Sequence, residues 1–138
     1  MTKLQDLIAE GKPIVADGGM GTMLMNAGLS QGQSPELWNI EKPDVIRGIH
    51  KGYIEAGAQI ILTNSFGGNA IRLGRNQLDD RVMELNRAAA RLAREMADAA
   101  DHPVVVGGSI GPMGEFMEPL GTLTFDEVVT IFKTQAQA

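Results

Sequence analysis

The stretch "AQIILTNS", residues 58–65, is a continuous apolar run that closes on threonine, asparagine and serine. Two further runs have the same form, "PIVAD" at 13–17 and "PVVVGGSI" at 103–110. Apolar residues follow one another in all three runs, which is typical of strands that are covered on both faces of a parallel sheet. The sequence therefore predicts three parallel strands, each ending in polar or glycine residues.

Amphipathic helical patterns lie between and after these runs. Residues 42–57 carry a proline near the first turn and stop at a glycine, the usual start and stop signals of a helix. Apolar residues recur at spacings of three and four over 80–100. A capping box from Thr124 to Glu127 predicts the start of a third helix. This order of strands and helices indicates an α/β fold with helical crossovers between parallel strands.

The same order matches part of a (β/α)8 TIM-type barrel. Such a barrel takes about 250 residues, and three strands cannot close one. Residues 1–138 are therefore expected to be the N-terminal three βα units of a longer barrel domain, and to be incomplete as a barrel on their own. The alternative is a complete three-stranded domain, in which the apolar helix faces would have little to pack on.

Composition and charge argue against several classes of protein. The formal net charge of −5 disfavours nucleic acid as a partner, because phosphates reward basic surfaces. No apolar run approaches the ~20 residues of a membrane span, and no signal peptide is recognisable, so a cytoplasmic location is expected. The sequence has no cysteine. His50 and His102 have no second histidine or carboxylate at ligand spacing, which argues against a metal site in this chain.

Small polar residues and glycines gather at the three strand ends, which read "DGGMGT" (17–22), "TNSFGG" (63–68) and "GGSIGPMGE" (107–115). Functional groups of parallel α/β folds lie at the carboxyl ends of the strands, so a shared binding site is expected there. A nucleotide is not expected in it. The stretch "GGMGTM" does not fit G-x-G-x-x-G, there is no P-loop motif, and Asp17 would repel phosphate.

The strand-end residues have alternative interpretations. The carboxylate of Asp17 can accept charge-assisted hydrogen bonds from an ammonium group of a ligand. It can equally cap a short helix over "GMGTMLMNAG" (19–28), because aspartate is a favoured helix cap. Asn64 and Ser65 can bind a ligand carboxylate or tie off their own loop. The residues alone leave these alternatives open.

Three segments carry a resemblance: "DGGMGTMLMNAGL" (17–29), "PELWNIEKPDVIRGIHKGYIEAGAQIILTNSFGG" (35–68) and "GGSIGPMGEFMEPLG" (107–121). Together they resemble the N-terminal part of the homocysteine S-methyltransferase family. Within it they look closer to the homocysteine barrels of bacterial betaine-type enzymes and cobalamin-dependent methionine synthase than to the S-methylmethionine enzymes. The resemblance implies a (β/α)8 barrel that moves a methyl group onto the thiol of homocysteine to give methionine.

The candidate substrate-binding residues are Asp17, Gly18, Gly19, Asn64, Ser65 and Ser109. The resemblance implies that Asp17 holds the amino end of homocysteine, and that the two glycines form the loop over which the substrate lies. Asn64 and Ser109 correspond to pocket walls. The family takes its zinc, which deprotonates the thiol, from cysteines on later strands. This chain has no cysteine and does not include those later strands. No catalytic residue and no metal ligand is therefore expected within it.

The methyl donor is left open, with betaine, methylcobalamin and a folate as candidates. The vertebrate betaine enzymes place a donor-binding tryptophan just before the Pro-Glu pair, whereas Trp38 follows that pair, so position does not support a cation–π contact to betaine. The predicted function is homocysteine methyl transfer by the full-length protein, with the fragment itself inactive. The alternative is a non-catalytic amino-acid-binding half barrel that acts with a partner chain. An oligomer is compatible with either function.

Overall fold

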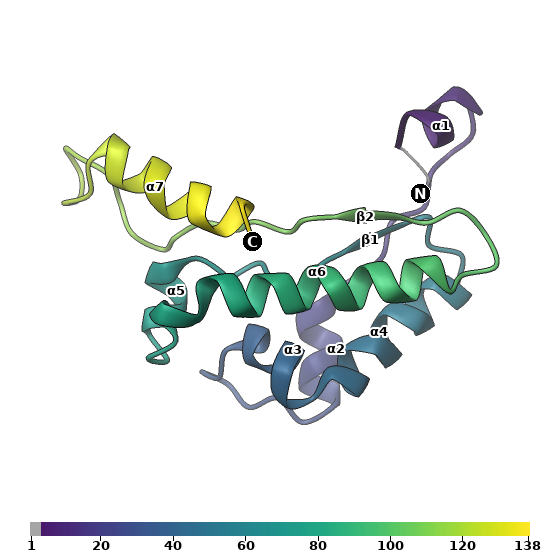
Figure 1. Ribbon diagram of the computed structural model, residues 1–138, viewed down its shortest axis with the longest axis horizontal. Coiled ribbons are helices and arrows are strands. Elements are labelled where there is room, and N and C mark those ends of the chain that lie inside the picture. Colours follow the sequence, from purple (N-terminus) through teal and green to yellow (C-terminus); the bar gives the residue numbers. More distant parts are fainter. Residues whose placement is uncertain (1–3) are drawn as a thin grey trace.

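The computed structural model describes residues 4–138 as an α/β fold built around a short parallel sheet (Figure 1). Its elements in chain order are α1 (Leu4–Ala9), α2 (Met20–Asn26), η1 (Pro35–Leu37), α3 (Trp38–Glu41), α4 (Pro43–Glu55), β1 (Ile60–Leu62), α5 (Ala70–Gly74), η2 (Asp79–Arg81), α6 (Val82–Asp98), β2 (Val105–Gly107) and α7 (Phe125–Ala136). None of the helices in this described part combines the length and the apolar character needed to cross a membrane.

The sheet consists of β1 and β2, which pair in parallel from Ile60 opposite Val105 to Leu62 opposite Gly107. Both strands lie within the runs that the sequence predicted, and both are shorter than those runs. Helices α5 and α6 form the crossover between them. The predicted parallel pairing with a helical crossover is therefore confirmed for these two strands, whereas closure into a barrel stays a prediction.

The prediction of a strand over residues 13–17 is wrong in its length. This segment pairs with β1 at one residue pair, Ala16 opposite Ile60, in parallel orientation. The amide of Asp17 donates to the carbonyl of Ile60 at 2.8 Å. Pro13 has no amide hydrogen to donate, and the chain leaves the sheet just after Asp17 to begin α2, so a longer ladder cannot form.

Helix α6 organises the core. It contacts α3, α4, β1, β2 and α7, and Figure 1 shows it running along the sheet. Leu85, Ala89 and Leu92 lie on its inner face and are fully buried. Helices α4 and α6 confirm the helical patterns predicted over 42–57 and 80–100.

The two faces of the sheet differ in their cover. Ile61 of β1 and Val104 pack against Ala93 and Ala97 of α6, and all four are buried. Neighbouring residues of a strand point to opposite faces, and Leu62 is 44% exposed. The expectation that both strand faces are covered is therefore wrong for the described residues, because α6 covers the face that carries Ile61.

Helix α7 begins with the predicted capping box. The hydroxyl oxygen of Thr124 accepts a hydrogen bond from the amide of Glu127 at 3.3 Å. The carboxylate of Glu127 accepts in return from the amide of Thr124 at 2.8 Å. These bonds satisfy amides at a helix start that have no intrahelical partner.

Replacing Thr124 with alanine is expected to lower the free energy of unfolding by about 1 kcal/mol, the usual cost of losing a side-chain cap. Urea denaturation of the full-length protein measures this change. Thr134→Ala is the matched control, because the hydroxyl of Thr134 donates to the carbonyl of Thr130 on the exposed side of the same helix. A loss no larger than that of the control would show that the cap does not stabilise α7.

Candidate functional site

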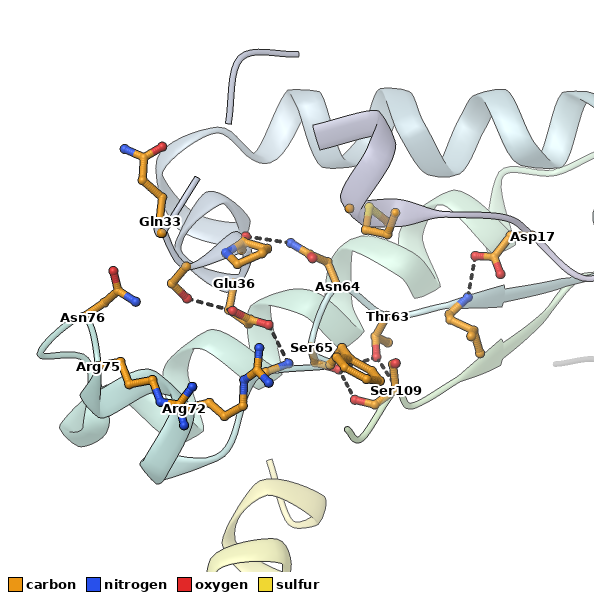
Figure 2. Close-up of a pocket in the computed structure, with 18 of the residues that line it drawn as sticks. Asp17, Gln33, Glu36, Thr63, Asn64, Ser65, Arg72, Arg75, Asn76 and Ser109 are labelled. Carbon is orange, nitrogen blue, oxygen red and sulfur yellow. Dashed lines mark hydrogen bonds between the residues drawn. The ribbon is translucent and has the colours of Figure 1, made fainter. Parts of the chain in front are cut away.

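The ends of the parallel segments border one cavity of about 610 Å³. The residues lining it include Asp17, Gly18, Gln33, Glu36, Thr63, Asn64, Ser65, Arg72, Arg75, Asn76 and Ser109. Figure 2 shows Asp17 at one side of this cavity and Arg72 and Arg75 at the other. Five of the six candidate binding residues thus line one space, and Gly19 is the one that does not.

Asp17 reaches across to the end of β1. Its Oδ2 atom accepts a hydrogen bond from the amide of Leu62 at 2.8 Å, so Oδ1 is the oxygen that can meet a ligand. Partial burial raises the pKa of Asp17 above its ordinary 3.8, and the hydrogen bond from Leu62 opposes that rise. A half-buried carboxylate is stabilised when a cation approaches it, because burial has removed part of its solvation. The site is therefore suited to an ammonium group.

The helix-cap interpretation of Asp17 is wrong. Gly19 occupies the N-cap position of α2, and no side chain accepts a hydrogen bond from the first turn there. The carboxylate of Asp17 is bonded to the sheet instead, through Leu62.

Tyr53 of α4 supports the loop that carries Gly18 and Gly19. A Cβ atom at Gly18 would lie 3.1 Å from the hydroxyl oxygen of Tyr53, closer than most real contacts. The same hydroxyl donates to the carbonyl of Gly19 at 3.3 Å. The missing side chain at Gly18 therefore makes room for the tyrosine ring, which holds the loop at the cavity.

Thr63, Ser65 and Ser109 join the ends of β1 and β2 (Figure 2). The amide of Ser109 donates to Thr63 Oγ1 at 2.9 Å, and Ser65 Oγ donates to the carbonyl of Ser109 at 2.8 Å. The two hydroxyl oxygens are 2.6 Å apart. Because the proton of Ser65 is directed to Ser109, Thr63 is the donor to Ser65, which closes a ring of hydrogen bonds. The side-chain hydroxyl of Ser109 takes no part in this ring.

Asn64 stands in the cavity wall with its amide nitrogen already bonded. That nitrogen donates to the carbonyl of Pro35 at 2.8 Å and to Asn39 Oδ1 at 3.0 Å. The residue is 4% exposed. Its amide therefore ties the loop after β1 to η1 and α3, which are distant in the sequence.

Glu36 is a buried acid of the cavity wall that sequence reasoning missed. It is 4% exposed, and its two carboxylate oxygens accept from the amide of Gly67 and the hydroxyl of Ser34, each at 2.7 Å. These bonds compensate the loss of solvation of the carboxylate. The one signal in the sequence is an acid between a proline and apolar residues in "SPELWN" (34–39).

The described residues hold no group of three His, Cys, Asp or Glu side chains placed to bind a metal ion. Trp38 is 4% exposed and packs in the core between α2 and α4. The ammonium group of Lys42 lies 3.9 Å from the centre of its ring. That ring is consequently not available to a cationic methyl donor.

Comparison with known proteins places these features in a family. The profile of the family described as "Homocysteine S-methyltransferase" matches residues 14–138. Methionine synthases of Mycobacterium leprae and Mycobacterium tuberculosis are each 37% identical over 120 residues, and the match covers 80% of this chain and 10% of each relative. The chain thus spans about a tenth of the length of these relatives.

A solved structure gives the same assignment. The metallated homocysteine methyltransferase MmuM from Escherichia coli superposes with a TM-score of 0.71 at 28% identity, over 80% of this chain and 42% of that protein. The superposition supports an α/β fold of that kind. With the match of the family profile to almost the whole sequence, the chain belongs to the homocysteine S-methyltransferase family.

Proposed function

We propose that residues 1–138 are the N-terminal portion of a homocysteine-binding (β/α)8 barrel domain. The full-length protein would transfer a methyl group from an activated donor to the thiol of homocysteine and release methionine. The observation that carries the proposal is the half-buried carboxylate of Asp17, fixed by Leu62 at the border of a cavity. The mycobacterial relatives that are named methionine synthases support methionine as the product.

In this proposal the chain's own residues bind and orient the amino acid. The ammonium group of homocysteine meets Asp17 Oδ1, where a charge-assisted hydrogen bond replaces lost solvation. The hydroxyl of Ser109 offers a further hydrogen bond, and the ring formed by Thr63, Ser65 and Ser109 keeps that strand end rigid. The loop of Gly18 and Gly19, which Tyr53 holds at the cavity, is the surface over which the substrate would lie.

The residues described here do not fit the zinc that the family resemblance implies. They contain no cluster of three potential ligands, and the sequence has no cysteine. Any zinc would therefore be held by other parts of the full-length protein, and residues 1–138 alone are not expected to turn over. For the donor, the occupied ring of Trp38 disfavours betaine, which makes methylcobalamin or a methylfolate the first donors to assay.

Isothermal titration of the full-length protein with L-homocysteine tests the proposal. We expect saturable binding, and binding at least about tenfold weaker for the analogue that lacks the amino group, because Asp17 then loses its cationic partner. Methionine formation from methylcobalamin, a methylfolate and betaine is measured in parallel. Absence of homocysteine binding, or equal affinity for homocysteine and for the analogue without the amino group, would refute the proposed function.

A further inference from the structure

Arg72 lies at the opposite side of the cavity from Asp17 (Figure 2). It belongs to α5, and its backbone amide donates to Asn69 Oδ1 at 3.0 Å. The residue is half-buried. Its guanidinium group makes no hydrogen bond or ion pair with any residue of 4–138. A cation that is partly desolvated and has no partner favours an anion beside it.

No carboxylate among residues 4–138 forms an ion pair or a hydrogen bond with this guanidinium. Glu36 is close, because a Cβ atom at Gly67 would lie 2.9 Å from its Oε1 and 3.4 Å from Arg72 Nε. Both oxygens of Glu36 are already engaged by Gly67 and Ser34. Arg75 pairs with Glu115 at 3.4 Å and donates to the carbonyl of Gly114 at 3.3 Å. Arg72 is therefore the arginine of the cavity wall whose donors have no partner among the described residues.

The cavity also has more room than homocysteine needs. Pockets of about 300–1,000 Å³ bury drug-sized ligands, which are much larger than this amino acid. With a volume of about 610 Å³, the cavity can hold a second ligand group beside an amino acid bound at Asp17.

We propose that Arg72 forms an anion subsite in this cavity, separate from the Asp17 end, which binds a carboxylate or phosphate group of a second ligand. A planar guanidinium binds such groups through two parallel hydrogen bonds. The methyl donor is the candidate for this second ligand, and that part of the proposal rests on the proposed function, whereas the binding of an anion to Arg72 does not.

Titration of the full-length protein with inorganic phosphate at constant ionic strength tests the subsite. Arg72→Gln is expected to weaken phosphate binding about tenfold, the usual effect of losing a charge-assisted hydrogen bond. Arg91→Gln removes the same charge from an exposed position on α6 and is expected to stay within about twofold of the wild type. Equal affinity in the Arg72→Gln variant and the wild type would overturn the proposal. Should Arg72→Gln not fold, Arg72→Lys keeps the positive charge but loses the two parallel hydrogen bonds of the guanidinium. This variant is expected to bind phosphate severalfold more weakly than the wild type.

A competition experiment separates a second ligand from the amino acid's own carboxylate. Saturating homocysteine is expected to leave phosphate affinity within about twofold, because the two groups occupy different ends of the cavity. Displacement of phosphate by homocysteine would show that Arg72 serves the amino acid, and would overturn the subsite. If homocysteine does not bind at all, the proposed function fails, and the comparison of Arg72→Gln with the wild type still decides the subsite.

Discussion

Replacing Asp17 with asparagine in the full-length protein is expected to weaken homocysteine binding by about 10- to 100-fold. The asparagine side chain has the same shape, and its amide oxygen can still accept the hydrogen bond that Leu62 donates to Asp17. The substitution therefore removes the negative charge and leaves the end of β1 in place. The loss comes from replacing an ionic hydrogen bond to the ammonium group with a neutral one.

Calorimetric titration of wild type and variant measures this loss. Asp44→Asn is the control, because Asp44 is a surface carboxylate paired with Arg47 at 2.8 Å and 94% exposed in its side chain. The affinity of the wild type should also fall as the pH drops through the pKa of Asp17, which burial raises above 3.8. An unchanged dissociation constant in Asp17→Asn would mean that the carboxylate serves the sheet through Leu62 and does not touch the substrate.

The fold could be predicted from sequence wherever the signal is local. The proline and glycine that flank α4, the apolar spacing of α6 and the capping box at Thr124 each depend on residues within a few positions of one another. The extent of the first strand could not be predicted in this way. Its ladder depends on which amides face β1, and only the pairing of Ala16 with Ile60 forms.

The site could be predicted in outline, because parallel strands bring their carboxyl ends together. The hydrogen bonds that hold the site in place could not be predicted. The loop after β1 is fixed by Asn39, Asn86 and Gln135, which donate to the carbonyls of Asn64, Gly68 and Ser65. These partners stand 18 to 70 positions apart in the sequence, and no periodic pattern marks a lone amide inside a helix as the support of a distant loop. Glu36 could not be predicted as a site residue either, because its partner Gly67 is 31 positions away in the sequence.

Acid is expected to destabilise the folded protein through His50, a histidine of α4 with no solvent exposure. Neither of its ring nitrogens has a hydrogen-bond partner among the described residues. Burial lowers the pKa of His50 from 6.5 to about 4, because the imidazolium form would lose its solvation without gaining a partner. In the unfolded chain the ring is solvated and titrates near its ordinary pKa.

The direction of the effect follows from this difference. Between the two pKa values the unfolded state binds a proton that the folded state does not, so the stability present above pH 6.5 is lost as the pH falls toward 4. The difference corresponds to about 3 kcal/mol. The pKa of His102 is raised instead, by the carbonyl of Ala58 and by Asp101. Its contribution is present at low pH and is lost as the pH rises, so it opposes the effect of His50.

Urea denaturation of the full-length protein between about pH 7 and pH 4.5 separates the two histidines. His50→Leu is expected to flatten the acid loss, and to leave stability near pH 7 unchanged or higher, because two unpaired polar atoms leave the interior. His102→Gln is expected to make the acid loss steeper, since it removes the histidine that binds its proton more tightly in the folded state. Parallel profiles for the wild type and His50→Leu would mean that the ring of His50 meets water or a hydrogen-bond partner in the folded protein.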